Sequence, residues 1–162
     1  MENLNIRNAN EEDFIKIAEI AMECPPMEAE RNSFYHIFTK YFKSTCFVAD
    51  PSSEELRGFI LGFLSQENPE EAYIHQICTN PKMRGRNIGR KLIEAFNEKV
   101  TALGCKKVIL ITKPINWNSI SFYKKLGFLE EKEGNIMNIL GTTAIKNYDG
   151  EGEHMVVFYK NL

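Results

Sequence analysis

Three arginines and two glycines lie close together near the middle of the chain, in a pattern suited to binding an anion. Arg84, Gly85, Arg86, Gly89 and Arg90 fall where an apolar strand ends and an amphipathic helix begins. Amide groups in the first turn of a helix have no partner within the helix and, with the helix dipole, attract anions. The stretch therefore predicts a pyrophosphate site, although its spacing alone fits an ordinary strand-to-helix turn with exposed arginines equally well.

A tyrosine further along the chain is a second candidate for chemistry. Asn116 begins a short amphipathic helix, Tyr123 lies on its apolar face, and Gly127 ends it. A positioned tyrosine hydroxyl can donate a proton to a leaving group. Without further context, however, a tyrosine on an apolar helix face is more often a packing residue.

A histidine lies in the strand that precedes the arginine cluster. Strict alternation would place Cys78 on one face of this strand and four other side chains on the opposite face, those of Tyr73, His75, Ile77 and Thr79. Imidazole has a pKa suited to a general base. A histidine that is satisfied in the core, or that only lines a site, explains His75 equally well. Because Cys78 is expected on the other face, we predict no thiol nucleophile.

The elements that must position these residues follow from apolar periodicity and turn residues. Helices are predicted from Asn10 to about Glu23, around Phe34–Tyr41, after Asn87 up to Gly104, and over residues 119–126. Strands are predicted over residues 4–7, 45–50, 57–65, 72–80, 107–112, from Phe128, and over 154–160, with a turn at 51–55. Residues 134–152 show no readable pattern. The order predicts a mixed sheet with helices, an α/β or α+β fold, in one domain over residues 1–162.

Composition excludes several classes of protein. The 162 residues are 43% hydrophobic and 26% charged, with a formal net charge of −2, which offers no basic face for nucleic acid. No apolar stretch approaches the roughly 20 residues that span a bilayer, and the first residues do not resemble a signal peptide. The four cysteines fit neither a zinc site nor a disulfide framework, so we expect reduced core residues in a cytoplasmic protein: Cys24, Cys46, Cys78 and Cys105.

Both candidate segments resemble motifs of the GNAT superfamily of N-acetyltransferases. Residues 84–89 resemble its Q/R-x-x-G-x-G/A pyrophosphate loop, with Asn87 where the family usually has glycine. Asparagine is the next residue most willing to adopt a positive φ. The later helix resembles the pattern N-x-x-A-x-x-x-Y-x-x-x-G-F, which is matched at Asn116, Tyr123, Gly127 and Phe128, with Ser119 in place of alanine.

The resemblance implies transfer of the acetyl group of acetyl-CoA directly to a primary amine, with no metal. It also implies a mostly antiparallel sheet of six or seven strands flanked by about four helices, splayed at strands 72–80 and 107–113 to admit the pantetheine arm. Tyr123 would protonate the departing thiolate, and His75 stands where polyamine-type relatives have a glutamate base. The implied cofactor-binding residues are Ile77, Cys78, Thr79, Arg84, Gly85, Arg86, Asn87, Ile88, Gly89, Arg90, Asn116 and Tyr123.

Other segments resemble one branch, the L-2,4-diaminobutyrate acetyltransferases: Glu23–Met27, Asn32–Tyr35, Thr45–Ala49, Gly58–Ile60 and Gln76-Ile77. This resemblance implies a small diamino acid or polyamine as acceptor, bound near Glu28, Glu30, Tyr35 and Tyr73. His75 stands where the branch has tryptophan. A peptide N-terminus or lysine as acceptor, and a non-catalytic acyl-CoA-binding module, remain open. We expect no nucleic-acid or membrane partner, and leave a homodimer open.

Overall fold

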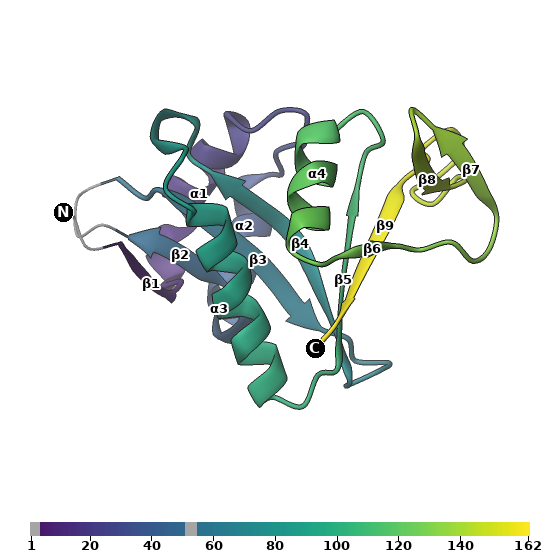
Figure 1. Cartoon of the computed structure of the whole chain (residues 1–162). Helices are drawn as coiled ribbons and strands as arrows, with labels where there is room; N and C mark the ends of the chain where they lie inside the picture. The colour runs from purple at the N-terminus through teal and green to yellow at the C-terminus, as the bar shows by residue number, and fades with distance from the viewer. Residues whose placement is uncertain (1–3, 51–54) are drawn as a thin grey trace. The chain divides into compact units, whose positions relative to one another are not determined.

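The structure, a computed structural model, describes residues 4–50 and 55–162 (Figure 1). It divides into two compact units, one ending at Cys105 and one beginning at Lys106. The described residues contain four α-helices, seven strands that each take part in an antiparallel ladder, and a separate two-stranded hairpin. These elements confirm the predicted mixed, mostly antiparallel α/β class. The single domain over residues 1–162 stays a prediction, and residues 51–54 of the predicted turn lie outside the described residues.

Four antiparallel strands form the sheet of the first unit, in the order β1-β2-β3-β4. Their bounds are close to those predicted from the alternation of apolar residues: β1 (Asn5–Asn8), β2 (Phe47–Asp50), β3 (Gly58–Leu64) and β4 (Glu71–Thr79). Opposite residues in such ladders share a face of the sheet. The register therefore shows which side chains of β3 and β4 point the same way.

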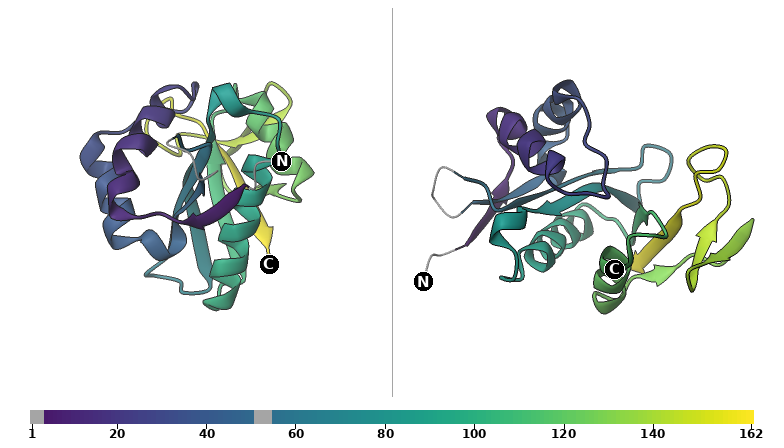
Figure 2. Two further views of the ribbon diagram at one scale, coloured as in Figure 1. Left: turned by 90° about the vertical axis from the view of Figure 1, so that its left-hand side faces the viewer. Right: turned by 90° about the horizontal axis from the view of Figure 1, so that it is seen from above.

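Helices cover both faces of this sheet (Figure 2). Residues of α1 (Phe14–Met22) and α2 (Asn32–Tyr41) share a buried cluster with one face of β3, whereas α3 (Ile88–Ala102) contacts the other face. The N-terminus of the first helical segment is capped, because the Asp13 carboxylate accepts the Asn10 N–H at 2.7 Å. These layers bring the segment between α1 and α2 to one face of β4.

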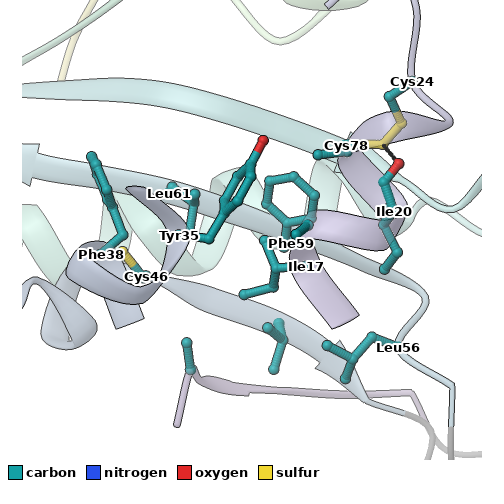
Figure 3. Packing of buried hydrophobic residues seen from close by; sticks show 14 residues of the cluster. Ile17, Ile20, Cys24, Tyr35, Phe38, Cys46, Leu56, Phe59, Leu61 and Cys78 are labelled. Atoms are coloured by element: carbon teal, nitrogen blue, oxygen red, sulfur yellow. Dashed lines mark hydrogen bonds between the residues drawn. A yellow bond between two sulfur atoms is a disulfide. The ribbon is translucent and has the colours of Figure 1, made fainter. Parts of the chain in front are cut away.

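The core under α1 and α2 contains aromatic and aliphatic side chains that are almost fully buried (Figure 3). Tyr35 of α2 and Phe59 of β3 have no exposed surface, and their ring centroids lie 6.4 Å apart. The opposite face of β3 carries glycine where α3 packs. A Cβ at Gly62 would lie 2.6 Å from the Tyr73 carbonyl oxygen and would also clash with the Phe96 ring, so only glycine fits there.

The second unit pairs three strands in the order β5-β9-β6 and adds a hairpin. The hairpin, β7 with β8, lies within residues 134–152, whose pattern was unreadable because its strands are only four residues long. The helix α4 begins at Trp117, two residues before the predicted start. The bounds are β5 (Lys107–Thr112), α4 (Trp117–Lys125), β6 (Leu129–Glu130), β7 (Ile136–Ile139), β8 (Thr142–Ile145) and β9 (Val156–Asn161).

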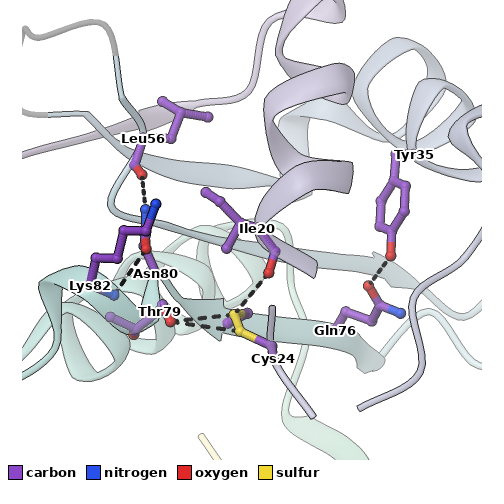
Figure 4. Close-up of a disulfide and its surroundings, with 9 residues drawn as sticks. Ile20, Cys24, Tyr35, Leu56, Gln76, Thr79, Asn80 and Lys82 are labelled. Atoms are coloured by element: carbon purple, nitrogen blue, oxygen red, sulfur yellow. Dashed lines mark hydrogen bonds between the residues drawn. A yellow bond between two sulfur atoms is a disulfide. The ribbon is translucent and has the colours of Figure 1, made fainter. Parts of the chain in front are cut away.

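Two of the four cysteines are paired. Cys24 and Cys78 form a disulfide with their Cα atoms 6.4 Å apart, within the range of protein disulfides (Figure 4). The expectation that all four cysteines are reduced is therefore wrong for this pair. The spacing of the cysteines in the sequence gave no indication of the bond. Cys46 and Cys105 are free and buried, as expected. Because disulfides persist mainly in oxidising compartments, cysteine usage no longer supports a cytoplasmic location.

Within residues 4–50 and 55–162, no helix is both long enough and apolar enough to span a membrane. The same ranges contain no group of three or more histidine, cysteine, aspartate or glutamate side chains arranged to hold a metal ion.

Candidate active site

The predicted anion-binding loop has the backbone geometry that its sequence implied. Asn87 precedes α3 with φ +56° and ψ +26°, the left-handed conformation that asparagine was expected to tolerate at this position. Gly85 also has a positive φ, of +97°. The Lys91 N–H makes the first bond of the helix, to the Asn87 carbonyl at 3.0 Å. The amides of residues 88–90 therefore have no helical carbonyl before them and are available to an anion.

The arginines of this loop lie at the surface, where their charge is accessible to a ligand. Arg84, Arg86 and Arg90 are all exposed. The Arg90 guanidinium pairs with Glu94 one turn along α3 at 2.8 Å, with both side chains about 60% exposed. An exposed pair of this kind contributes only about 0.3–0.5 kcal/mol, so it offers little resistance to exchange with a phosphate.

A buried asparagine fixes the start of the loop. The Asn80 side chain accepts the Lys82 N–H at 3.1 Å and donates to the Leu56 carbonyl at 3.4 Å (Figure 4). Its backbone N–H donates to the Arg57 carbonyl at 2.8 Å. These bonds hold the short helix η3 (Pro81–Met83) at the end of β4, so the glycine-containing turn starts from a rigid base.

A β-bulge interrupts the alternation of β4 at His75. The register pairs Leu61 with Gln76 but Gly62 with Ile74, so the register skips His75. An extra residue in one strand sends two consecutive side chains toward the same side. The contacts agree, because the His75 ring packs on α2 and the Gln76 side chain bonds to Tyr35 of α2.

The predicted face of β4 is therefore wrong beyond the bulge. Ile77 and Thr79 lie opposite Ile60 and Gly58 in the ladder, on the face that α3 covers. Cys78 instead shares the α1 side with His75, since it is bonded to Cys24 after α1. The side chains of Ile77 and Thr79 thus do not line the surface that His75 faces. Strict alternation failed because it assumes an unbulged strand.

His75 lies among aromatic rings beside a carboxylate. Its ring centroid is 4.9 Å from that of Phe34, 5.7 Å from that of Phe38 and 6.4 Å from that of Tyr73. Its Nε2 lies 4.0 Å from Oε1 of Glu30, in the segment between α1 and α2. The structure therefore brings together three of the residues predicted for the acceptor side and the base. An imidazole beside a carboxylate can bind an ammonium group and accept a proton from it.

Tyr35 lies directly beneath this cluster, with its hydroxyl bonded on two sides. It accepts the Glu30 N–H at 3.0 Å and donates to Gln76 Oε1 at 3.0 Å (Figure 4). The Gln76 amide in turn donates to the Glu28 carbonyl at 3.1 Å. Burial raises the pKa of Tyr35, so its hydroxyl remains a donor at neutral pH. Gln76 was missed as a site residue, although the segment Gln76-Ile77 carried part of the branch resemblance.

Tyr123, in the second unit, is buried in an aromatic environment. Its ring lies 5.8 Å from Phe128 and 5.7 Å from Phe158 between centroids. Burial raises the pKa of Tyr123 above its ordinary value. The group is therefore protonated at neutral pH, as a general acid must be.

The spacing of the second motif has a structural reason. Gly127, with φ +88°, ends α4, and the Phe128 N–H bonds back to the Tyr123 carbonyl at 3.1 Å. This is a Schellman motif with its usual apolar contact, here between Tyr123 and Phe128. At the other end of α4, the Asn116 side chain accepts the Ser119 N–H at 3.4 Å. Asn116 is thus shown to cap the helix, whereas its contact with a cofactor stays a prediction.

A surface hollow of about 260 Å³ lies within the second unit. Its lining combines the chain after β5 with the hairpin turn and the chain before β9, and contains none of the predicted site residues: Lys113, Pro114, Ile115, Ile139, Leu140, Gly152, Glu153 and His154.

Residues 14–128 match the model of the acetyltransferase (GNAT) family, so the match includes both the arginine–glycine loop and Tyr123. The chain belongs to this family. The matched range contains both segments that resemble the family's motifs, in the same order as in the family.

Among GNAT relatives, the chain is similar to the L-2,4-diaminobutyric acid acetyltransferase of Chromohalobacter salexigens. The two are 30% identical over 123 residues, which are 76% of this chain but 64% of the relative. The chain thus spans less than two thirds of the length of the relative it matches.

Solved GNAT structures share the fold. The diaminobutyrate acetyltransferase EctA from Paenibacillus lautus, in complex with L-2,4-diaminobutyric acid and coenzyme A, has a TM-score of 0.75 at 19% identity, covering 98% of this chain and 95% of that chain. The ribosomal-protein-S18-alanine N-acetyltransferase from Escherichia coli has a TM-score of 0.72 at 18% identity, covering 98% and 94%. At these identities the likeness establishes the fold alone.

Proposed function

We propose that this protein is an N-acetyltransferase that moves the acetyl group of acetyl-CoA directly to a primary amine. The observation that carries the proposal is the left-handed Asn87 at the start of α3, in a loop where the family binds pyrophosphate. The exposed Arg84, Arg86 and Arg90 supply the charge, and the first amides of α3 supply the donors, that a pyrophosphate needs.

The proposed cofactor contacts come mainly from the backbone. The amides from Gly85 to Arg90 bind the pyrophosphate, and Arg84 and Arg86 add positive charge. Ile77, Cys78 and Thr79 at the end of β4 offer main-chain groups to the amide-bearing arm, as an added strand would. Only the backbone of Cys78 takes part, because its sulfur is bonded to Cys24.

In the proposed reaction His75 is the general base. It takes a proton from the ammonium form of the acceptor, directly or through water, and so frees the nitrogen lone pair for attack on the thioester carbonyl. A backbone N–H near Ile77 stabilises the oxyanion. When the carbon–sulfur bond breaks, Tyr123 donates its proton to the thiolate. The new C–N bond and the S–H bond balance the step without a covalent enzyme intermediate.

The proposed acceptor is a small primary amine that carries a second charge, such as a diamino acid or a polyamine. Its support is the carboxylate of Glu30 beside His75, which favours a cationic ligand. The diaminobutyrate acetyltransferases to which the chain is similar act on such an amine by name.

A direct assay tests both levels of this proposal. Purified protein is given acetyl-CoA and one acceptor at a time, and free thiol is measured as it is released. The acceptors are L-2,4-diaminobutyrate, ornithine, putrescine, spermidine, a neutral monoamine, and a peptide with a free N-terminus and an internal lysine. A diamine with the highest kcat/KM supports the proposal. If kcat/KM is higher with the peptide than with any diamine, the acceptor is a peptide instead. If acetyl-CoA binds but no acceptor causes thiol release, the protein is only a binding module.

Location and oligomeric state belong to the same proposal. A cytoplasmic location is the prediction from the sequence, and a homodimer is an assembly that the sequence leaves open. Light scattering coupled to size-exclusion chromatography measures the mass of the particle against the 18.7 kDa of one chain, and fractionation of the source cells tests the location.

A further inference from the structure

The segment that carries Glu28 and Glu30 is hydrogen-bonded through its backbone to two side chains of the core. Residues 23–31 form turns and bends without a helix or strand, and Glu28, Ala29 and Glu30 are exposed. No apolar side chain of these three residues anchors them in the core. Their backbone is bonded to two side chains: the Tyr35 hydroxyl accepts the Glu30 N–H, and the Gln76 amide donates to the Glu28 carbonyl.

These two anchoring side chains are themselves buried. Tyr35 has no exposed surface, and Gln76 is 5% exposed. The Tyr35 hydroxyl is used both as donor and as acceptor, and the Gln76 amide is used through both its oxygen and its nitrogen. If the segment moved away, the buried hydroxyl would lose one partner and the buried amide would lose another. Leaving a buried polar group unpaired is costly, so the pair restrains the segment to one position.

The bulge in β4 makes this restraint relevant to the chemistry. It sends His75 and Gln76, neighbours in sequence, toward the same helix. Gln76 fixes the segment, and His75 faces the carboxylate that the segment carries, at 4.0 Å. The position of the Glu30 carboxylate relative to the imidazole is thus set by the residue next to the imidazole.

We propose that Tyr35 and Gln76 are positioning residues that set the affinity for the amine by holding Glu30 beside His75. The proposal rests on the proposed function, because it concerns the acceptor of that reaction. Neither residue touches the reacting atoms. Their effect passes through the backbone of residues 28–30.

The test uses Tyr35→Phe, which removes only the hydroxyl, and Thr39→Val as its matched control. Thr39 is also a fully buried hydroxyl of α2, but it donates to the Glu11 and His36 carbonyls instead. Tyr35→Phe should raise KM for the amine by about 10-fold, the loss expected for about one hydrogen bond, with kcat and KM for acetyl-CoA changed less than about 2-fold. Thr39→Val should lower Tm without raising that KM.

Two further measurements separate positioning from a loss of stability. Hydrogen exchange of the Glu30 amide, which Tyr35 protects, should accelerate in Tyr35→Phe but not in Thr39→Val. Gln76→Met keeps the side-chain length without its polar ends. Gln76→Met should also raise KM for the amine. The double variant of Tyr35→Phe and Gln76→Met should raise this KM by less than the product of the two single fold-changes.

The outcomes are distinct. Equal amine KM values in Tyr35→Phe and wild type, with Tm lowered as in Thr39→Val, would overturn the positioning role while the acetyltransferase proposal stands. Unchanged exchange of the Glu30 amide would also overturn it. If the wild-type protein acetylates no amine, the proposed function itself fails, and this inference fails with it.

Discussion

His75 Nε2 and Glu30 Oε1 lie 4.0 Å apart, although one belongs to β4 and the other to the segment between α1 and α2. Their side chains are 29% and 43% exposed, so the pair is open to solvent. An exposed pair of this kind is worth little to stability. The pair matters for ligand binding, because an ammonium group can reach the carboxylate from solvent while the imidazole accepts a proton.

The first prediction separates the two glutamates of that segment. Glu30→Gln should raise KM for a diamine by about 10-fold or more and leave KM for acetyl-CoA unchanged, because it removes charge that binds ground state and transition state alike. Glu28→Gln should have a smaller effect, since Gln76 binds the Glu28 backbone, which the substitution keeps. Steady-state kinetics with both substrates varied measure this, with the exposed Glu98→Gln on α3 as control. Equal effects of Glu28→Gln and Glu30→Gln would contradict the assignment.

The second prediction concerns the acid. Tyr123→Phe should lower kcat by roughly 10- to 1,000-fold, in the range seen when a general acid is lost. The fold should survive, because the substitution keeps the ring that packs against Phe128 and Phe158. Tyr159→Phe is the matched control, a half-buried tyrosine of the same unit whose ring, not its hydroxyl, contacts Lys107. An undiminished kcat in Tyr123→Phe would mean that water or another group protonates the thiolate.

The third prediction is a pH dependence. Burial raises the pKa of Tyr123 above the ordinary tyrosine value of about 10, so the group holds its proton at every pH below that. A general acid is lost only as pH rises through its folded-state pKa. The kcat profile should therefore show no fall caused by Tyr123 between about pH 7 and pH 10. A basic limb below pH 9 that disappears in Tyr123→Phe would refute the raised pKa.

The fourth prediction tests the loop backbone. Asn87→Gly should be tolerated, because glycine adopts a φ of +56° without strain. Asn87→Val places a β-branched residue there, at a cost of about 1–2 kcal/mol, and should raise KM for acetyl-CoA while sparing that for the amine. Calorimetric titration with coenzyme A checks binding without turnover. Equal affinities for both variants would show that the left-handed turn does not shape the anion site.

The fifth prediction concerns the cysteines. Burial raises the pKa of Cys46 to about 12 and also raises that of Cys105, so neither thiol should react quickly with iodoacetamide in the native protein near pH 8. Unfolding without reductant should expose these two thiols, and unfolding with reductant all four. Mass spectrometry counts the adducts. Four adducts without reductant would show that Cys24 and Cys78 are not paired.

The sequence by itself determined the local features of this protein. The turn before α3 and the ends of α3 and α4 follow from Asn87, Gly104 and Gly127, whose backbone preferences act over a few residues. The spacing from Tyr123 to Phe128 is of the same kind, since it closes one helix turn. Such features survive in sequence patterns because both partners lie within the same short segment, and they were enough to indicate the family.

Only the tertiary structure decided how the acceptor side is arranged. Alternation along β4 predicted one face for His75 and Ile77, but the bulge separates them, and nothing in the local sequence marks a bulge that depends on pairing with β3. The contacts of Glu30 with His75, of Tyr35 with Gln76 and of Cys24 with Cys78 each join distant parts of the chain. Their partners are chosen by how α1 and α2 pack on the sheet, because residue type alone does not specify which distant group a carboxylate, an amide or a thiol will meet.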